Sequence, residues 1–409
     1  MADRSVDFLL IGGGIASARC AQALRREGAK GSILVVGREA DPPYSRPPLS
    51  KEYLAGKIER DDALLVEADW WESNGVELLT RTSVMKLDTG ERVAKLSSRE
   101  EVGFGKALIA TGANVRRLRA DGGDLEGIHY LRSFGNADAI RAAAEGASSA
   151  VLVGGSYIGC EVAATLTELG VRCSILMQED VTLERQFGEG VGRFFMGVLE
   201  EHGIEFHGGD SLARFEGDGE RVTRVVSEGG AVLEGELVVV GAGVVPDVML
   251  ARQAGLEIGE NGGIVCSSGL ETSVPGIFAA GDVAEWDSKL HGERVRIEHW
   301  DVAAEHGKTA ARNMAGGSAD HEAVPYFWSD LSDWVGLEYV GAGSGEETVI
   351  RGSLDDGEFT AFSLDAGRVV AAVTVGRGED LPHARRMIVD RATPDAAALA
   401  DADTDLESL

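Results

Sequence analysis

Two short glycine-rich turns, beginning at Gly12 and Gly154, constrain the fold of this 409-residue chain more than any other feature. Each turn follows a run of apolar residues (6–11 and 150–153) and precedes a helical pattern and a second apolar run (32–36 and 172–176). Strand, glycine turn, helix and strand in this order are typical of a nucleotide-binding unit. The distance between the turns is far too long for a solenoid repeat, so the sequence predicts two nucleotide-binding domains.

The first turn, residues 12–17, reads GGGIAS. Gly12 permits a tight strand-to-helix turn, and Gly14 has no Cβ, so a pyrophosphate can approach the backbone N–H groups at the helix N-terminus. Glu39 comes soon after the second apolar run and is predicted to bind the hydroxyls of an adenosine ribose. The predicted contacts to the first dinucleotide are Gly12, Gly14, Ile15, Ala16, Ser17 and Glu39.

The second turn, residues 154–159, reads GGSYIG and has Ser156 where the middle glycine usually stands. The nearby carboxylate of Glu179 disfavours a ribose 2′-phosphate, so NADH is preferred and NADPH stays the alternative. Arg185 is the nearby base, placed to meet a phosphate. Tyr157 fits a gate over the nicotinamide pocket and a core-facing aromatic equally well. The predicted contacts to this dinucleotide are Gly154, Ser156, Tyr157, Ile158, Gly159, Glu179 and Arg185.

Three further motifs follow in the order typical of flavoproteins with two dinucleotide-binding domains. They are ATG at 110–112, GAGVVPD at 241–247 and AAGDV at 279–283. Asp282 follows a glycine at the end of a strand and is suited to accept hydrogen bonds from the ribityl hydroxyls of a flavin. The sequence therefore predicts FAD at one turn and a nicotinamide dinucleotide at the other.

Charge and cysteine content exclude several classes of protein. The chain has 39 basic and 68 acidic residues, a net charge of −29, which argues against nucleic acid and anionic membranes as partners. Its four cysteines have neither disulfide-framework nor metal-ligand spacing, and we expect a reducing compartment, the cytoplasm, and no metal. No targeting segment or long apolar run is recognised, so no membrane insertion is expected.

Three segments resemble the ferredoxin and rubredoxin reductases and apoptosis-inducing factor, within the FAD-dependent pyridine nucleotide-disulfide oxidoreductase superfamily. They are PYSRPPLSK (43–51), IEHW (297–300) and FWSDLSDWVG (327–336). The resemblance implies an α/β fold with two Rossmann-like dinucleotide-binding domains, for FAD and NAD, and a small α+β C-terminal interface domain. The expected boundaries are 1–118 with 246–322 for FAD, 119–245 for NAD, and 323–409 for the C-terminal domain, with an acidic tail that frays from Asp395.

The resemblance also implies roles for individual residues. Lys51 falls where the family has a lysine beside the flavin N5, and Glu161 falls at its salt-bridge partner; these are the predicted catalytic residues. A buried cation there would stabilise a reduced flavin, and a carboxylate limits the cost of burying it. His299 and Trp328 are also consistent with a buried core histidine and a core tryptophan. Further implied cofactor contacts are Arg46, Val84, Thr111, Gly112, Arg132, Gly243, Gly281, Asp282, Glu298, His299 and Trp328.

The predicted function is an FAD-dependent NADH oxidoreductase that passes electrons to a small iron–sulfur protein, a ferredoxin or rubredoxin. No cysteine lies between Arg46 and Lys51, so electrons must leave the flavin directly for an external acceptor. One alternative is a redox protein like apoptosis-inducing factor, with a long-lived charge-transfer complex and redox-dependent dimerisation; another is an NADH:quinone or dye reductase. A homodimer is left open. Acidic ferredoxins would need a local basic patch, which Arg116, Arg117 and Arg119, or Arg385 and Arg386, would supply.

Overall fold

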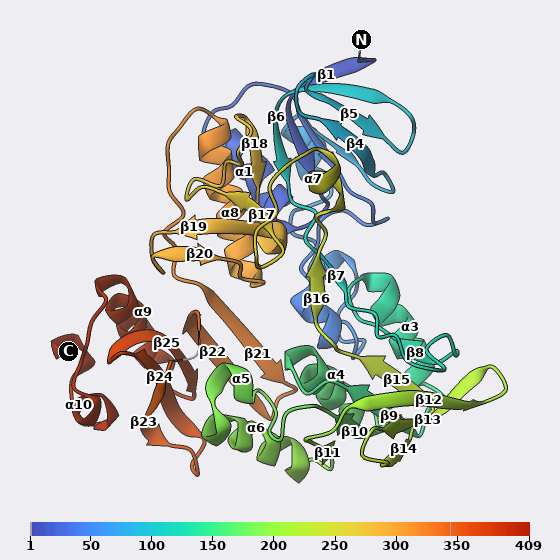
Figure 1. Cartoon of the computed structure of the whole chain (residues 1–409), viewed down its shortest axis with the longest axis vertical. Coiled ribbons are helices and arrows are strands. Elements are labelled where there is room, and N and C mark those ends of the chain that lie inside the picture. The colour runs from blue at the N-terminus through green and yellow to red at the C-terminus, as the bar shows by residue number, and fades with distance from the viewer. Residues whose placement is uncertain (1, 344) are drawn as a thin grey trace. The chain divides into compact units, whose positions relative to one another are not determined.

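The computed structural model in Figure 1 describes residues 2–343 and 345–409. Its contacts divide the chain into two units. The first contains the residues up to Ser45 together with Asp61–Asn114 and Val244–Pro325, and the second contains Arg46–Arg60, Val115–Gly243 and Tyr326–Leu409. Residues 46–60 thus belong to the second unit, whereas the sequence placed them in the FAD-binding domain. The division into three functional domains stays a prediction.

The first unit is built around a seven-stranded sheet in the order β3-β2-β1-β6-β5-β4, with β18 beside β6 (Figure 1). The neighbours β1, β2, β3, β6 and β18 pair in parallel, and β4 and β5 pair antiparallel. All four residues of β2 are buried, as expected for a parallel strand covered on both faces. The strands are β1 (Arg4–Ile11), β2 (Ile33–Val36), β3 (Val76–Leu79), β4 (Val84–Asp88), β5 (Val93–Leu96), β6 (Glu101–Ile109) and β18 (Ile277–Ala279).

Helices α1 (Ile15–Arg26) and α8 (Trp300–Met314) pack against each other beside this sheet (Figure 1). A Cβ added to Gly307 of α8 would lie 2.3 Å from the carbonyl oxygen of Ala16, so only glycine allows this close approach. The other elements of the first unit, with the β7–β16 pair, are α2 (Trp70–Ser73), α7 (Met249–Gln253), η2 (Asp61–Ala63), η3 (Gly281–Val283), β7 (Ala113–Val115), β16 (Val244–Pro246), β17 (Ile264–Cys266), β19 (Ala284–Ser288) and β20 (Glu293–Val295).

The second unit contains a five-stranded parallel sheet in the order β11-β10-β9-β15-β8. The strand predicted at 172–176 and the helix predicted after the second glycine turn are both present as β10 and α4. The elements are η1 (Pro47–Ser50), β8 (Ile128–His129), α3 (Phe134–Ala144), β9 (Ser149–Val153), α4 (Tyr157–Glu168), β10 (Arg172–Leu176), α5 (Glu184–Phe187), α6 (Glu189–Glu201), β11 (Glu205–His207), β12 (Leu212–Asp218), β13 (Arg221–Ser227), β14 (Val232–Glu234) and β15 (Leu237–Val240).

The C-terminal part of the second unit is a five-stranded antiparallel sheet in the order β21-β22-β25-β24-β23. Its strands lie within residues 326–375, and the helix α9 follows from Leu381, in agreement with the small α+β C-terminal domain that the resemblance implied. The elements are β21 (Tyr326–Leu331), β22 (Val335–Gly341), β23 (Glu347–Ser353), β24 (Glu358–Asp365), β25 (Arg368–Val375), η4 (Gly378–Asp380), α9 (Leu381–Asp390), α10 (Ala396–Ala400) and η5 (Leu406–Ser408).

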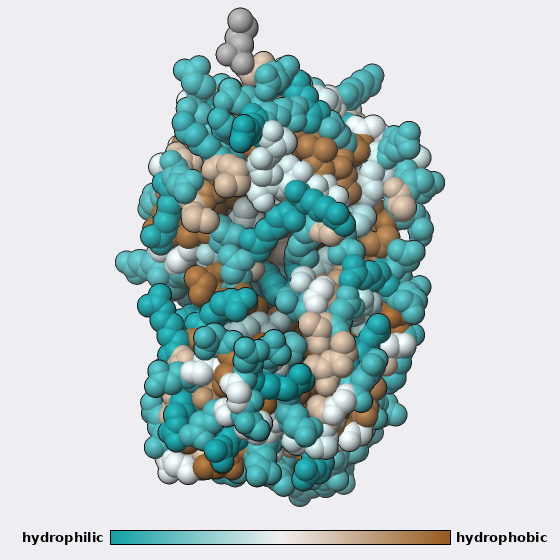
Figure 2. Space-filling view, turned by 90° about the vertical axis from the view of Figure 1, so that its right-hand side faces the viewer, coloured by the Kyte–Doolittle hydropathy of each residue, from teal (hydrophilic) through white to brown (hydrophobic). Residues whose placement is uncertain are grey.

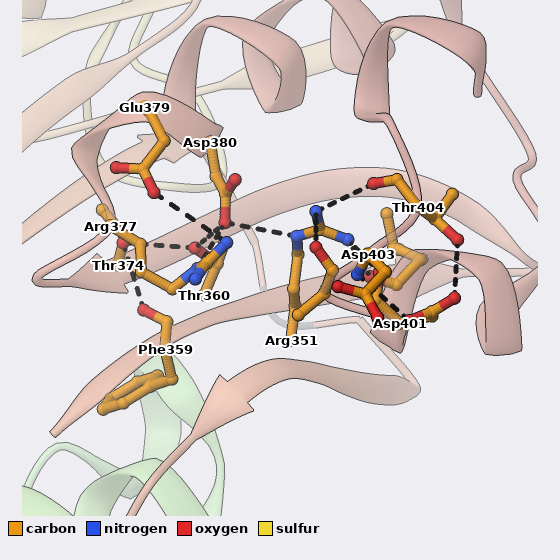
Figure 3. Close-up of polar contacts among 12 residues, drawn as sticks. Arg351, Phe359, Thr360, Thr374, Arg377, Glu379, Asp380, Asp401, Asp403 and Thr404 are labelled. Carbon is orange, nitrogen blue, oxygen red and sulfur yellow. Dashed lines mark hydrogen bonds and ion pairs between the residues drawn. The ribbon is translucent and has the colours of Figure 1, made fainter. Parts of the chain in front are cut away.

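The expectation that the acidic tail frays from Asp395 is wrong. Leu399 and Leu406 are buried, and the buried guanidinium of Arg351 donates hydrogen bonds to main-chain carbonyls of the tail (Figure 3). The carbonyls belong to Leu399, Asp401, Ala402 and Thr404. The acid count gave no sign of this, because the tail docks through two leucines and its backbone rather than through its carboxylates.

No helix in the described ranges is long and apolar enough to cross a membrane. The molecular face in Figure 2 is mostly hydrophilic, with separate hydrophobic patches. Both findings agree with the charged composition, and neither carries a further conclusion about location.

Candidate active site

The first glycine turn has the geometry that a pyrophosphate requires. Gly12 has a φ of 128°, and a Cβ there would lie 2.0 Å from the carbonyl oxygen of Ala110, so only glycine fits. Gly14 is the N-cap of α1 and provides no side-chain cap, and no atom lies within 4 Å of a Cβ added to it. The first N–H groups of α1, at Ile15 and Ala16, thus have no side-chain cap, and the space around Gly14 is open, which suits an anion. Ser17 is fully buried beyond them, in the helix.

The Gly281–Asp282 turn lies beside this first turn of α1, and both turns were predicted to contact FAD. A Cβ added to Gly281 would lie 3.6 Å from Cβ of Ala16. His299, the N-cap of α8, is half-buried, and desolvation lowers its pKa to about 4, although nearby Asp282 favours the protonated ring. Glu298 accepts a hydrogen bond from Arg296, whose guanidinium also reaches the Asp282 carbonyl at 3.3 Å.

Four other predicted contacts lie elsewhere in the first unit. Glu39, beyond the end of β2, accepts a hydrogen bond from the Tyr44 hydroxyl at 2.5 Å. The hydroxyl of Thr111 donates to the carbonyl of Asp247 at 2.8 Å, and the N–H of Asp247 donates to Gly112 at 2.9 Å, so the ATG and GAGVVPD motifs meet. Val84 begins β4 and packs, partly buried, against the core.

The second glycine turn repeats the geometry of the first. A Cβ at Gly159 would lie 2.0 Å from the carbonyl oxygen of Gly154, which has a φ of 115°. Ser156 is the N-cap of α4, but its hydroxyl caps no N–H, so the first N–H groups of α4, from Tyr157 and Ile158, stay open to an anion. The turn thus suits a second pyrophosphate.

The charged pair predicted for the second dinucleotide already interacts within the chain. Nε of Arg185 lies 2.5 Å from a carboxylate oxygen of Glu179. The Arg185 side chain is 69% exposed, so it is available to solvent as well as to this carboxylate. Gly243, another predicted cofactor contact, has a φ of 84°. Its carbonyl oxygen accepts a hydrogen bond from the N–H of Arg116 at 2.9 Å.

The structure favours the core-facing alternative for Tyr157. Its ring packs edge-on against Phe327 at 4.8 Å and Phe187 at 6.0 Å between ring centroids. Burial raises the pKa of the phenol above its usual value. Two of these rings continue into the hydrophobic core, because Phe187 and Phe327 both contact Tyr339.

The predicted ion pair between Lys51 and Glu161 is present. Nζ of Lys51 lies 3.0 Å from Oε1 of Glu161, and both side chains are less than a tenth exposed. Lys51 follows the 3₁₀ turn η1, which Pro47 and Pro48 begin, and Glu161 lies one turn into α4. Burying a cation and a carboxylate costs desolvation free energy, which their attraction only partly offsets. A functional role would account for this cost.

Two hydroxyls that bind the Glu161 carboxylate were not predicted. Ser50 donates to one oxygen and Ser329 of β21 donates to the other, the latter at 2.6 Å. Thr165 of α4 donates to the Ser50 carbonyl at 2.8 Å and fixes the loop. Both serines lie inside motifs that carried the family resemblance, PYSRPPLSK and FWSDLSDWVG. These motifs are the sequence feature from which the two contacts could have been predicted.

Three more predicted positions lie in the second unit. The guanidinium of Arg46 donates to the carbonyl of Arg132. Trp328 of β21 stacks with Tyr326, with centroids 6.1 Å apart, and lines an open cavity of about 580 Å³. Asp330 also lines this cavity, and burial raises its pKa while nearby Lys51 opposes the shift.

The four cysteines are all free and buried. Burial raises the pKa of Cys160 to about 12 and that of Cys173 to about 11, and it raises the pKa values of Cys20 and Cys266 further. Their thiols therefore stay protonated near neutral pH, and a thiol is a poor nucleophile.

We expect an alkylating reagent near neutral pH to modify none of the four thiols in the folded protein and all four after unfolding, because only the unfolded chain exposes them. Mass spectrometry of the intact protein counts the labels. Labelling of Cys160 in the folded state would show that the segment after the second glycine turn opens.

Two family models match the chain. The model for pyridine nucleotide-disulphide oxidoreductases matches residues 6–307. The chain belongs to this family. A second model, the reductase C-terminal domain, matches residues 326–409 of this oxidoreductase. The resemblance drawn from residues 43–51, 297–300 and 327–336 is therefore confirmed, as is the α/β fold class.

The relatives of this oxidoreductase include ferredoxin reductases that match it over almost their full length. The chain is 34% identical to the ferredoxin–NAD(+) reductase component of the anthranilate 1,2-dioxygenase system of Burkholderia cepacia, covering 96% of this chain and 97% of the relative. The structure of the ferredoxin reductase of the CYP199A2 system from Rhodopseudomonas palustris superposes with a TM-score of 0.94 at 30% identity, covering 98% and 99%. The covalent putidaredoxin reductase–putidaredoxin complex gives 0.93 at 32%, covering 100% and 98%.

Proposed function

We propose that this chain is a flavoprotein reductase that oxidises NADH and passes the electrons to a small iron–sulfur protein. The observation that carries the proposal is the pair of glycine turns with open helix N-termini, each at the end of a parallel strand, in a chain that also buries the Lys51–Glu161 pair. The full-length ferredoxin reductase relatives support the acceptor class. Bound FAD would accept the hydride of NADH and release electrons singly, because flavins convert two-electron into one-electron chemistry.

Each unit supplies its own part of the binding machinery. In the first unit, the α1 N-terminus would hold the FAD pyrophosphate, Glu39 the adenosine ribose and Asp282 the ribityl hydroxyls. In the second unit, the α4 N-terminus would hold the NADH pyrophosphate and Glu179 its ribose. Hydride transfer needs no general base, so Lys51 and Glu161 serve electrostatics and positioning.

The same carboxylate supports NADH over NADPH. Glu179 would face a 2′-phosphate, and its pairing with Arg185 leaves that arginine partly neutralised. A homodimer and a cytoplasmic location remain proposals; four free, buried thiols support a reducing compartment.

Spectroscopy and turnover test the proposal directly. The purified protein is expected to bind FAD, to be reduced by NADH, and to reduce a ferredoxin or rubredoxin over many turnovers. A persistent long-wavelength absorbance band with slow reoxidation would instead favour the alternative resembling apoptosis-inducing factor, and turnover with quinones alone would favour the quinone reductase. Protein that binds no FAD would overturn the proposal.

An exposed arginine cluster, Arg116, Arg117 and Arg119, is proposed as the docking patch for an acidic acceptor. All three are exposed, and none forms an ion pair with a residue in the described ranges; Arg117 lies over the ring of Tyr130 at 5.0 Å. Arg386, in the competing patch, is engaged by the carbonyls of Leu406 and Leu409. In a chain of net charge −29, an unpaired basic cluster is the local attraction that an acidic partner needs.

We expect Arg116→Glu/Arg117→Glu to slow association with an acidic ferredoxin about tenfold at low ionic strength, because charge steering has this order of effect. Stopped-flow reduction of the ferredoxin measures the rate, and added salt should shrink the difference. Arg193→Glu/Arg224→Glu is the control, since it changes the net charge equally at exposed residues of the same unit. An association rate equal to that of the wild type, with the same salt dependence, would remove the cluster from the docking surface.

A further inference from the structure

One side chain near the proposed flavin site has a task that the sequence did not indicate. β18 ends at Ala279, and the N–H of Ala280 donates to Ile109, the last residue of β6, at 3.1 Å. The next N–H, that of Gly281, lies beyond the sheet. It donates instead to Nδ1 of His306 on α8, at 3.2 Å. Because a buried backbone N–H must find a partner, His306 completes the turn that the strand cannot.

Close packing fixes the position of this imidazole. His306 is fully buried, and Gly307, its neighbour in α8, has room for no side chain against the Ala16 carbonyl of α1. Gly281 has a φ of 75°, and a Cβ there would lie 3.3 Å from Ala303 of α8. The Gly281–Asp282 turn, α1 and α8 are therefore locked together around the His306 ring.

The hydrogen bond requires a neutral ring with its proton on Nε2, because a protonated Nδ1 would point a second N–H at the N–H of Gly281. Edge-on rings of Trp286 and His321 lie 4.4 Å from the His306 ring, centroid to centroid. Among residues 2–343 and 345–409, no hydrogen-bond acceptor meets Nε2 of either histidine. Nothing nearby therefore stabilises an imidazolium.

Desolvation outweighs the mixed effects of the surrounding charges. Burial, with a contribution from His321, holds the pKa of His306 well below its usual value, and burial lowers the pKa of His321 to about 4. Glu305, on α8, favours protonation of His321, and His291 opposes it. Asp282, in the turn itself, favours protonation of His299. Burial raises the pKa of Cys20 on α1, so this thiol stays neutral.

We propose that His306 is a positioning residue for the flavin: its neutral ring fixes the Gly281–Asp282 turn, and acid that protonates the ring releases FAD. The inference rests on the proposed function, in which Asp282 binds the ribityl hydroxyls. When the turn is released, the His306 ring becomes exposed and takes up a proton as the pH falls below about 6.5. In the FAD-bound protein the ring stays neutral. FAD affinity is therefore full above that pH and is lost progressively below it.

Two variants separate the hydrogen bond from the titration. In His306→Asn the amide oxygen stands near the position of Nδ1 and accepts the Gly281 N–H without titrating, whereas His306→Leu fills the space and accepts nothing. We expect His306→Leu to weaken FAD binding about tenfold at pH above 7, and His306→Asn to bind within about threefold of the wild type, since an unsatisfied buried donor is costly. Titration of the apoprotein with FAD measures affinity, and the fluorescence of freed flavin measures release during acidification.

The pH midpoint of FAD release is the readout that a purely structural role would not move. We expect it to fall in His306→Asn and to stay at the wild-type value in the control His202→Asn, whose histidine is exposed. An unchanged midpoint in His306→Asn would assign acid release to another group, such as His299, and overturn the proposal, as would wild-type affinity in His306→Leu. If His306→Leu does not fold, the midpoint of His306→Asn decides. Wild-type protein that binds no FAD would refute the proposed function instead.

Discussion

Replacing Lys51 with methionine is expected to slow flavin reduction by NADH at least about a hundredfold while FAD stays bound. The side chain is the only cation that pairs with the buried Glu161 carboxylate in the described ranges. Its loss leaves that carboxylate without its countercharge. In the proposed function the pair serves the electrostatics of the flavin, and the loss of a preorganised electrostatic contact costs about 10²–10³ in rate. Stopped-flow absorbance of the flavin, with NADH and no acceptor, measures the reduction rate.

Two further variants test whether this effect belongs to the pair. Glu161→Gln keeps the shape of the side chain and one accepting oxygen but removes the charge and the other acceptor, and we expect a smaller loss of about tenfold. Lys57→Met is the matched control: Lys57 lies in the same segment and pairs with Glu168 at 3.1 Å, but its side chain is 58% exposed. A Lys51→Met enzyme reduced at the wild-type rate would contradict a catalytic role for the pair.

Replacing Arg351 with methionine is expected to lower the free energy of unfolding of the C-terminal domain by about 3–5 kcal/mol and to release the tail. The guanidinium holds four tail carbonyls, and its Nε lies 3.6 Å from buried Asp380 (Figure 3). Asp380 keeps Arg377 and Thr360 as partners, so most of the cost comes from the tail. Leu399 and Leu406 would then lose their burial, and each contributes about 1.5–3 kcal/mol when fully buried.

Limited proteolysis and denaturant unfolding test this prediction together. In Arg351→Met the tail should be cleaved under conditions that leave the wild type intact, and Arg351→Lys should give an intermediate result because a lysine keeps the charge but lacks the planar fork. Arg368→Met, at a partly exposed pair with Asp365, should change stability by less than about 0.5 kcal/mol. Equal protection of the tail in Arg351→Met and the wild type would show that the leucines alone hold it.

Local patterns predicted the strands and turns of both nucleotide-binding halves well. The apolar runs at 6–11 and 172–176 became β1 and β10, and the spacing of glycines identified the helix N-termini, because these features are decided within a few residues. The Lys51–Glu161 pair was predicted only through the family motif. No local rule joins residues 110 positions apart.

Other features followed from contacts distant in sequence and were missed for that reason. Ser329 binds Glu161 across 168 residues, and His306 binds Gly281 across 25. The tail was misjudged because its five acids dominate its composition, whereas its docking depends on Arg351, about fifty residues earlier. The segment 46–60 packs in the second unit for a similar reason: Tyr53 bonds Asp138 at 2.6 Å, and Ser50 bonds Glu161.

The Arg351 contact has a consequence for how the end of this protein tolerates change. The Arg351 guanidinium donates its tail hydrogen bonds to main-chain oxygens and not to carboxylates. Most side chains between Leu399 and Leu406 can therefore vary without weakening these hydrogen bonds. The number of residues between those anchors is not free, because adding or removing one would rotate the oxygens away from the fork. Natural variation and engineering should therefore find that this stretch tolerates substitutions but not insertions or deletions.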